Sequence, residues 1–423
     1  MTDISLTAHG GSFHADVAVP GDKSLSHRAL LFAGMAEGDS LVLGLGTGAD
    51  IAATAAALRQ LGVDIEGSKV RSPGIGGWQQ PSEPINCGNS GTTMRLLAGA
   101  LSTSPVVATL VGDASLSTRP MRRLLEPLRS LGGRIETSDD TAPLTVGGAS
   151  DVHPADITID IASAQVRTAF EFAALAADRD SSIDSPAGFR DHTERWLEAV
   201  GRGEWISSSR FVVHPGPLPP ARFEVPGDPS SAAYLWACAA ISPESKVTTR
   251  SISLNPGRLG FLQILEAMGA GVDAVVTGET GGDPVGDVTV EGAALRGTVV
   301  DGPLVASALD ELPLVAVLGA YAEGITSVRD ASELRAKESD RIEAVVAMIR
   351  ALDGAIEPAS DGFDVVGTGF LSGGVVRTHH DHRIAMAAAV AATRADDPVV
   401  ITDAEVAAVS WPDFYQALED LWL

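Results

Sequence analysis

Positive charge is scarce in this 423-residue sequence, which has 30 lysine and arginine residues against 55 aspartate and glutamate residues and a net charge of −25. Lysine in particular occurs at only four positions: Lys23, Lys69, Lys246 and Lys337. A nucleic-acid backbone requires a basic binding surface, and anionic membranes attract basic segments. The charge balance therefore argues against a nucleic-acid partner and against a membrane partner.

Cysteine and long apolar runs are also scarce. The two cysteines, Cys87 and Cys238, cannot build a disulfide framework or a cysteine metal cluster, which indicates a reducing compartment. No apolar run reaches the roughly 20 residues that a membrane-spanning helix needs. The first residues lack the basic start and apolar core of a secretory signal. We therefore expect a cytoplasmic protein.

The remaining composition is that of a globular protein, with 45% apolar and 20% charged residues. The length is sufficient for two or three domains, each with its own core.

An amphipathic stretch followed by a short β-like run recurs along the chain. It covers residues 56–66, 124–136, 195–205, 261–273 and 345–357. The turn residues of these stretches are spaced by roughly 70 residues, with one longer interval: Gly62, Gly132, Gly201, Gly269 and Asp353. Glycine at this point fits the left-handed residue that commonly follows a helix.

A second series of alanine-rich segments has the same period. Each segment opens at a residue that can cap a helix, near Ser24, Ser90, Ser163, Ser230, Asp310 and Asp381. Sequences rich in Ala, Leu and Gly resemble themselves by chance, but two independent series with one period favour a true repeat. We predict an α/β fold of six units, three in each half, with two helices and several strands per unit.

The tetrapeptide VPGD occurs twice, at 19–22 and 225–228, each time before the helix that opens a half. It predicts where the chain enters each domain. The first domain would then span residues 20–225. The second would be discontinuous, with residues 1–19 and 226–423.

The starts of the helices of the second series are flanked by residues that are unusual for an acidic protein, at points where unpaired N–H groups and the helix dipole favour phosphate or carboxylate. These residues are Lys23, Ser24, Arg28, Asn89, Gly91, Arg95, Ser163, Ala164, Gln165, Arg167, Asp310, Glu311, His382 and Arg383. The other helix series adds Arg119, Arg190, Lys337, Glu338 and Arg341. Two of the four lysines, Lys23 and Lys337, lie in this set, so we predict that these two lysines hold an anion. Arg122, Arg123 and Arg129 are interpreted as ordinary surface charges.

Two other motifs have simpler interpretations. GLGTGA at 44–49 matches a dinucleotide-binding pattern, but the same helix–turn–strand unit recurs elsewhere without these glycines, which favours a turn. His379, His380 and His382 do not have the spacing of common paired metal ligands, so a helix cap with a substrate contact is preferred. We expect no metal and no cofactor.

Several motifs in order resemble the enolpyruvyl transferase family, and within it the branch whose acceptor is shikimate 3-phosphate. They are PGDKSLSHRAL, NCGNSGTTMRLLAGAL, STRPM, SAQVRTA, RDHTERWL, VPGDPSSAAY, DELPLVA, ELRAKESDRI, DHRIAMA and SWPDF. The resemblance covers the whole chain. It implies two similar domains of three βαβαββ units each, an inside-out α/β barrel arrangement, with the active site in the cleft between them.

The resemblance also implies substrates and roles. Asp310 would be the base toward the 5-hydroxyl of shikimate 3-phosphate, Glu338 the acid and base at the methylene of phosphoenolpyruvate, and Lys23 a bridge between both substrates that shares in proton transfer. Shikimate 3-phosphate would contact Lys23, Ser24, Arg28, Ser163, Ala164, Gln165, Arg190, Asp310 and Lys337. Phosphoenolpyruvate would contact Lys23, Asn89, Gly91, Arg119, Gln165, Arg341, His382 and Arg383. The protein is expected to be a monomer.

One position departs from the family pattern. Some members have a lysine where this chain has Val409, so a cation contact to phosphoenolpyruvate is missing or comes from elsewhere. Gly91 has no side chain, which by resemblance leaves room for the inhibitor glyphosate.

Two alternatives were weighed. A UDP-N-acetylglucosamine enolpyruvyl transferase usually has a cysteine where this chain has Ala114, and its first motif differs. A non-catalytic binder of phosphorylated metabolites gains nothing from Asp310 and Glu338 beside bound phosphates, because like charges repel. Their presence favours catalysis.

Overall fold

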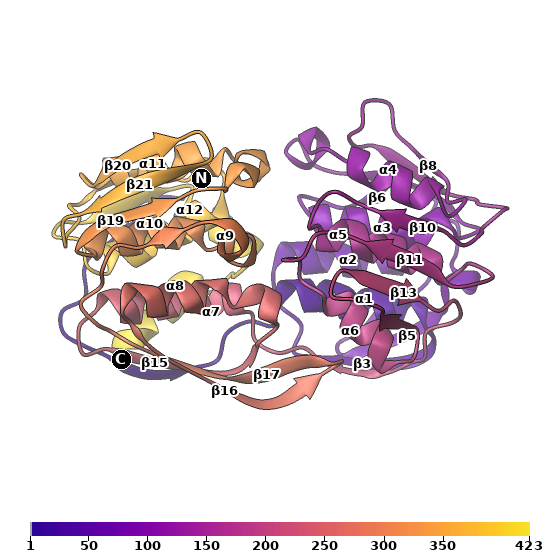
Figure 1. The fold of residues 1–423 in the computed structure, drawn as a ribbon, viewed down its shortest axis with the longest axis horizontal. Helices are drawn as coiled ribbons and strands as arrows, with labels where there is room; N and C mark the ends of the chain where they lie inside the picture. The colour runs from indigo at the N-terminus through magenta and orange to yellow at the C-terminus, as the bar shows by residue number, and fades with distance from the viewer. Residues whose placement is uncertain (1) are drawn as a thin grey trace. The chain divides into compact units, whose positions relative to one another are not determined.

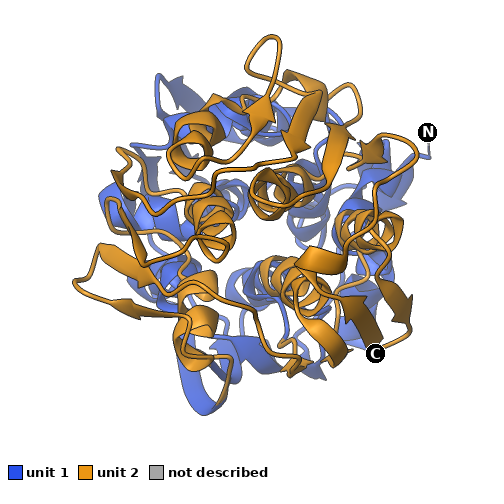
Figure 2. Ribbon diagram, turned by 90° about the vertical axis from the view of Figure 1, so that its right-hand side faces the viewer, with its two compact units in different colours: residues 1–22, 227–278, 284–423 blue, residues 23–226, 279–283 orange. Residues whose placement is uncertain are grey.

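The computed structural model describes residues 2–423 and divides into two compact units (Figures 1 and 2). Unit 1 contains the N-terminal segment up to Asp22, residues 227–278 and residues 284–423. Unit 2 contains residues 23–226 and the short segment 279–283, which is the turn of a long hairpin. Each unit has its own hydrophobic core.

Unit 2 contains six helices and three four-stranded sheets among its described residues. The helices are α1 (Lys23–Met35), α2 (Ala49–Gln60), α3 (Gly91–Ser102), α4 (Arg122–Arg129), α5 (Ala164–Ala174) and α6 (His192–Ala199). The strands are β3 (Glu37–Leu43), β4 (Asp64–Glu66), β5 (Lys69–Pro73), β6 (Ile85–Asn86), β7 (Val107–Val111), β8 (Ile135–Glu136), β9 (Leu144–Gly147), β10 (Asp156–Thr158), β11 (Ser181–Asp184), β12 (Gly203–Trp205), β13 (Arg210–Val213) and β14 (Arg222–Glu224).

The described residues of unit 1 form two four-stranded sheets and one three-stranded sheet. Its helices are α7 (Pro229–Ile241), α8 (Gly260–Met268), α9 (Gly302–Ala308), α10 (Leu312–Tyr321), α11 (Arg341–Ala351), α12 (His382–Ala392) and α13 (Phe414–Glu419). Its strands are β1 (Ile4–Leu6), β2 (His14–Val17), β15 (Lys246–Ser253), β16 (Gly271–Thr280), β17 (Asp283–Glu291), β18 (Val299–Val300), β19 (Gly324–Val328), β20 (Ala355–Ala359), β21 (Gly362–Gly367), β22 (Gly374–Arg377) and β23 (Val399–Thr402).

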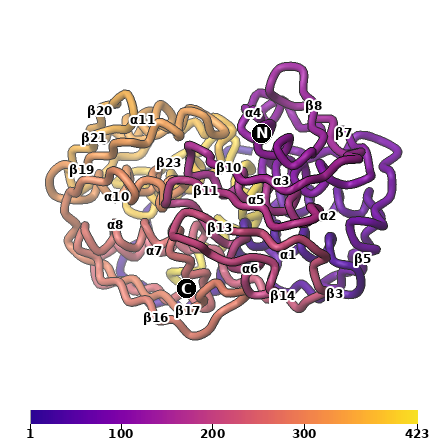
Figure 3. Tube along the Cα trace, turned by 45° about the vertical axis from the view of Figure 1, so that its right-hand side comes forward, coloured from indigo at the N-terminus to yellow at the C-terminus, as the bar shows by residue number. Residues whose placement is uncertain are grey.

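The sheets repeat one pattern. In the orders β6-β7-β9-β8, β10-β11-β13-β12, β14-β3-β5-β4 and β18-β19-β21-β20, the first pair is parallel and the next two pairs are antiparallel. The parallel pair is joined by a crossover that contains a helix in three of these sheets. Figure 3 shows the course of the chain, with its colour running by residue number from the N-terminus to the C-terminus. The predicted α/β fold of six repeats is confirmed.

Helices lie on the inside of each unit and the sheets lie outside them, as Figure 2 shows for unit 2, whose helices are seen nearly end-on. Every side chain of α7 is buried, and so is every side chain of α12. Such helices have apolar residues on all sides because they pack against other helices and a sheet at once. In unit 2 the corresponding close contact is between α3 and α5, where an added side chain at Gly99 would meet the backbone of Ala169 at 2.4–2.8 Å.

The predicted helix boundaries are largely confirmed. The five turn residues have positive φ angles between 61° and 98°: Gly62, Gly132, Gly201, Gly269 and Asp353. Ser90, Ser163 and Asp381 cap α3, α5 and α12 through their side chains. Ser24 and Ser230 lie inside their helices instead, because α1 begins at Lys23 and Asp228 caps α7 ahead of Pro229. Asp310 does not cap α10, which begins at Leu312 after Glu311.

Within residues 2–423, no single helix is long and apolar enough to cross a membrane. The pair α9 and α10 meets that criterion only when the two are combined, and they are bent by 108° at their break.

Candidate active site

The first cationic cluster of unit 2 lies at the start of α1. Lys23 is the first residue of this helix, and its Nζ atom lies 3.3 Å from Oδ2 of Asp50 on α2. Arg28 lies one turn later and donates from Nε to Thr193 at 2.7 Å and from a terminal nitrogen to Thr168 at 2.9 Å. Its other terminal nitrogen donates to the carbonyl oxygen of Ser24 at 3.1 Å. The two cations are therefore held in place by the protein itself.

A second group lies at the start of α3. A terminal nitrogen of Arg119 donates to Oδ1 of Asn89 at 2.6 Å, and Nδ2 of Asn89 donates to Asp113 at 2.7 Å. A Cβ atom added to Gly91 would lie 2.7 Å from a terminal nitrogen of Arg95 and 3.6 Å from one of Arg119. The absence of a side chain at Gly91 thus lets two guanidinium groups approach the helix N-terminus.

Arg95 connects this group to the start of α5. It donates to Oε1 of Gln165 at 2.8 Å, and Nε2 of Gln165 donates to Thr92 at 3.0 Å. Ala164 is the first residue of α5, and Ser163 caps it by accepting from the N–H of Val166. The starts of α3 and α5 are therefore neighbours, which brings together the predicted residues of two sequence motifs.

Beneath the start of α1, a buried histidine anchors a chain of hydroxyl groups. Nδ1 of His27 lies 2.7 Å from Oγ1 of Thr54, which lies 2.7 Å from Oγ1 of Thr93. Burial lowers the pKa of His27 to about 3, so this imidazole is neutral at physiological pH. We assign it a structural role.

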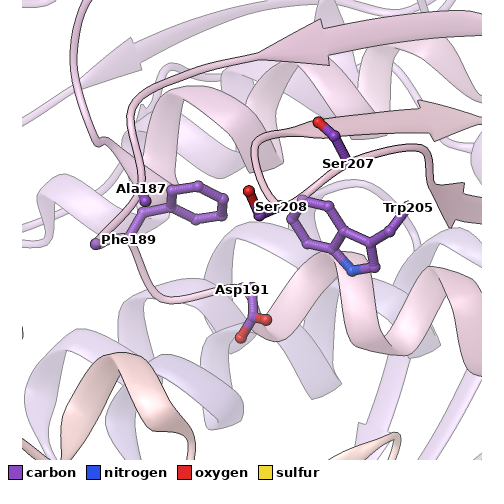
Figure 4. A pocket seen from close by; sticks show the side chains of 7 residues that line it. Ala187, Phe189, Asp191, Trp205, Ser207 and Ser208 are labelled. Carbon is purple, nitrogen blue, oxygen red and sulfur yellow. The ribbon is translucent and has the colours of Figure 1, made fainter.

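The loop between β11 and α6 contains Arg190. Beside it, residues of this loop and of the β12–β13 hairpin line a cavity of about 360 Å³: Ala187, Gly188, Phe189, Asp191, Trp205, Ser207 and Ser208. Figure 4 shows the rings of Phe189 and Trp205 entering the cavity from its two sides, with Ser208 between them. Sequence reasoning did not find this cavity, because its lining comes from two loops of ordinary composition.

In unit 1, Arg341 is the centre of a carboxylate cluster. It is buried at the start of α11, and its Nε atom donates to Oδ2 of Asp381 at 2.8 Å. One terminal nitrogen lies 3.4 Å from Oδ1 of Asp310, and the other forms a close ion pair with Glu338. Burial disfavours its charge, but Glu338, Asp381 and Asp310 more than compensate, so the pKa of Arg341 lies above its ordinary value.

Arg383, in the first turn of α12, approaches the same cluster. Its terminal nitrogens lie 3.5 Å from Oε1 of Glu311 and 4.0 Å from Oδ2 of Asp310. Burial raises the pKa of the neighbouring Tyr234 to about 12, although Arg383 acts in the opposite direction. The structure thus brings Asp310, Glu338, Arg341 and Arg383 together within unit 1.

Lys337 and His382 lie at the edges of this cluster. Lys337 is half-buried between a short 3₁₀ helix (Ser332–Ala336) and α11. Burial lowers the pKa of Lys337, and Asp310 and Glu338 offset part of that effect. His382 is the first residue of α12 and is buried.

One basic residue of this unit was missed by sequence reasoning. Arg258 is buried and donates to Asp22 at 3.0 Å, to Asp228 at 2.8 Å and to Ser230 at 2.8 Å. Ser230 in turn donates to Glu311. The repeated VPGD motif was a signal for half of this cluster, since Asp22 and Asp228 are the last residues of its two copies. Their partner Arg258 lies in an Asn-Pro-Gly-Arg turn that matches no motif.

The motifs with simpler interpretations have local structural explanations. Gly44, the first glycine of the 44–49 motif, has a φ of +71°, and an added Cβ atom would lie 2.5 Å from the carbonyl oxygen of Val225. His379 and His380 have positive φ angles of 52° and 57° in the turn before α12. Val409 ends a 3₁₀ helix. Among residues 2–423, no group of three or more His, Cys, Asp or Glu side chains is arranged to hold a metal ion.

The repeated fold and the cationic clusters at helix starts define an α/β enzyme that binds small anionic molecules. Residues 8–418 match the family model for EPSP synthase (3-phosphoshikimate 1-carboxyvinyltransferase). The 3-phosphoshikimate 1-carboxyvinyltransferase of Herpetosiphon aurantiacus is 44% identical over 419 residues, covering 97% of each chain. That of Halorhodospira halophila is 44% identical over 421 residues, covering 98% of this chain and 95% of the relative.

The solved structure of EPSP synthase from Acinetobacter baumannii has a TM-score of 0.89 and 36% identity, covering 100% of this chain and 98% of that one. The chain belongs to the EPSP synthase family. Its activity is that of a 3-phosphoshikimate 1-carboxyvinyltransferase, an enzyme of the shikimate pathway and aromatic amino-acid biosynthesis. The family implies shikimate 3-phosphate and phosphoenolpyruvate as substrates.

Proposed function

We propose that the cationic groups of unit 2 and the Arg341 cluster of unit 1 together form one active site, so that neither unit is sufficient for turnover. The observation that supports this most strongly is the pairing of Arg341 with two carboxylates, Asp310 and Glu338, next to a second buried arginine, Arg383. A simple anion-binding site would not keep two carboxylates beside its cations. An addition–elimination reaction requires both kinds of group.

The acceptor, shikimate 3-phosphate, would be bound mainly by unit 2. The proposed ligands are Lys23, Ser24, Arg28, Ser163, Ala164, Gln165, Arg190, Asp310 and Lys337. The starts of α1 and α5 supply N–H groups and hydroxyl groups for the phosphate, and Arg28 is already oriented by Thr168 and Thr193. Asp310 and Lys337 of unit 1 would bind the other side of the molecule.

Phosphoenolpyruvate carries a phosphate and a carboxylate, and arginines bind both groups through two parallel hydrogen bonds. The proposed ligands are Lys23, Asn89, Gly91, Arg119, Gln165, Arg341, His382 and Arg383. Arg119 is fixed by Asn89 in unit 2, and Arg341 and Arg383 are fixed by carboxylates in unit 1. The fixed geometry lowers the entropy that binding costs.

Asp310 would remove the proton from the 5-hydroxyl of shikimate 3-phosphate while that oxygen bonds to C2 of phosphoenolpyruvate. Glu338 would protonate C3, which gives a tetrahedral ketal phosphate. The bond from C2 to the phosphate oxygen then breaks and Glu338 takes a proton back from C3. Phosphate leaves with the electrons of that bond and takes up the proton that Asp310 removed from the 5-hydroxyl. Lys23 would neutralise charge on both substrates and share in proton transfer.

A phosphate-release assay tests this function. We expect stoichiometric phosphate release only when both substrates are present, and none when UDP-N-acetylglucosamine replaces shikimate 3-phosphate. Release with the alternative acceptor would contradict the assignment. Binding of both substrates without release would identify a non-catalytic binder.

We also propose that the enzyme is monomeric and acts in the cytoplasm. Its strong net negative charge of −25 favours mutual repulsion between copies. Sedimentation of the purified protein at low and high salt tests the oligomeric state. A monomer gives one species near 43.5 kDa at both salt concentrations.

A further inference from the structure

We propose that Arg167 is a positioning residue for the acceptor substrate, because it fixes the loop that carries Arg190. This inference rests on the proposed function, which takes Arg190 and Arg28 as ligands of shikimate 3-phosphate. Arg167 itself has no exposed surface and does not contact the substrate in this account.

The guanidinium group of Arg167 contacts the Arg190 loop at its beginning and its middle, and it contacts the first turn of α6, which follows the loop. One terminal nitrogen donates to Oγ of Ser185 at 2.9 Å, and Nε donates to Oε1 of Glu194 at 2.5 Å. The ring of Phe189, the residue before Arg190, lies 4.2 Å from the guanidinium carbon. One side chain therefore defines the path of the loop.

The hairpin opposite the loop is attached to the same group. The nitrogen that binds Ser185 also donates to the carbonyl oxygen of Ser209 at 3.1 Å, and the ring of Trp205 lies 5.4 Å from the guanidinium carbon. A cation over aromatic rings is stabilised by their π electrons, and Arg167 lies over both rings. Lysine at this position would keep the charge but lose the planar group that makes these contacts at once.

The neighbouring residues extend this arrangement to Arg28. Thr168 follows Arg167 on α5, Thr193 precedes Glu194 on α6, and the two threonine hydroxyl oxygens lie 2.7 Å apart. Both threonines accept hydrogen bonds from Arg28. Adjacent residues of α5 and α6 thus hold Arg28 on one side and the Arg190 loop on the other.

The other side of the loop is open. Its residues 187–189 and 191 line the cavity of about 360 Å³ shown in Figure 4, and Asp191 also accepts a hydrogen bond from Nε of Arg195 at 2.8 Å. The contacts with Arg167 hold the loop on its buried side, through Ser185 and through Phe189 next to Arg190.

The charge of Arg167 is balanced within its buried surroundings. Glu171 lies 3.9 Å away on the same helix, and its burial and the nearby Glu194 raise its pKa well above the ordinary value, against the effect of Arg167. Glu194, whose Oε1 atom lies 2.5 Å from Nε, is the closer carboxylate partner of Arg167. A buried cation persists in a protein core only when such a partner is buried with it.

Steady-state kinetics of Arg167→Lys, Arg190→Ala and the double variant test the proposal, with Arg129→Lys as the control. Arg129 lies in the same unit but on α4, where it donates to the carbonyl oxygen of Ile135. For Arg167→Lys we expect the KM for shikimate 3-phosphate to rise about tenfold, while kcat and the KM for phosphoenolpyruvate change by less than about twofold. In the double variant, Arg167→Lys should not raise the KM for shikimate 3-phosphate beyond its value in Arg190→Ala. The reason is that Arg167 acts only through the contact between Arg190 and this substrate.

A second variant, Phe189→Ala, removes the ring next to Arg190 without altering a buried charge, and should reproduce the selective rise in KM. If Arg167→Lys does not fold, Phe189→Ala alone tests the positioning role. An Arg190→Ala variant with unchanged KM would refute Arg190 as a ligand, and with it this inference. If Arg190→Ala raises the KM but Arg167→Lys and Phe189→Ala do not, or if the effects multiply in the double variant, only the positioning role is refuted.

Discussion

Oδ1 of Asp310 lies 3.4 Å from a terminal nitrogen of Arg341, and the same guanidinium group holds Glu338 and Asp381. Burial opposes ionisation of Asp381, but Arg341 outweighs it and the pKa of Asp381 is lowered. One arginine therefore orients both carboxylates to which we assign proton transfer.

Replacement of that base should separate binding from catalysis. We expect Asp310→Asn to lower kcat by about 100-fold or more, as the loss of a general base does, while both substrates still bind. Phosphate release and calorimetric binding provide the two measurements. Asp364→Asn, which breaks an ion pair with Arg329 in the same unit, is the matched control and should leave kcat unchanged. Near-normal phosphate release by Asp310→Asn would show that another group is the base.

A methyl group at Gly91 should impair the phosphoenolpyruvate site. The added Cβ atom of Gly91→Ala would lie 2.7 Å from the terminal nitrogen of Arg95 that donates to Gln165, so this nitrogen must shift. We expect a higher KM for phosphoenolpyruvate and weaker inhibition by glyphosate, with an unchanged KM for shikimate 3-phosphate. Inhibition curves of the wild type and the variant provide the measurement. Wild-type activity that persists at high glyphosate would contradict the account of this site.

The pH profile should depend on Lys337. Its pKa is lowered by burial from the ordinary 10.5, so the free enzyme loses this proton at a lower pH than an exposed lysine does. If the charged form binds shikimate 3-phosphate, kcat/KM for that substrate falls as the pH rises through the lowered pKa. Arginine keeps its charge, so Lys337→Arg should move the alkaline limb to higher pH. An alkaline limb that is the same in both proteins would exclude Lys337 as its origin.

Stability at acidic pH should depend on His27. Its folded pKa of about 3 lies below the ordinary 6.5, so between these values the unfolded chain binds a proton that the folded protein does not. The free energy of unfolding therefore decreases as the pH falls below 6.5, by up to about 1.4 kcal/mol per pH unit from this group. Above pH 6.5 the contribution is constant. His27→Gln should flatten the dependence in urea unfolding between pH 4.5 and 7, and an equally steep profile in the variant would contradict the buried neutral histidine.

Much of the fold could be predicted from the sequence because the repeat leaves two kinds of local signal. Gly62 and Gly269 mark helix ends through backbone angles that other residues rarely adopt, and Ser90 and Ser163 mark helix starts through their caps. At α7 the same reasoning chose Ser230, whereas the cap is Asp228, since the following proline fits the first helical turn.

The candidate residues could be predicted as members of motifs, but not their partners. The pairing of Arg28 with Thr168 and Thr193, and that of Arg258 with Asp22 and Asp228, joins residues that are 30 to 236 positions apart. No local periodicity carries such information. Arg167 was noted only as one of the cations at a helix start, because its importance comes from two loops that fold around it.

The central claim is that the cations of both units act on the same two substrates. A crystal structure of the protein with shikimate 3-phosphate and glyphosate bound tests it most directly. We predict one shikimate 3-phosphate molecule within hydrogen-bonding distance of Lys23 and Asp310 together, and glyphosate in contact with both Arg119 and Arg383. Ligands that bind to one unit only, with the other cluster more than about 4 Å from every ligand atom, would contradict the claim.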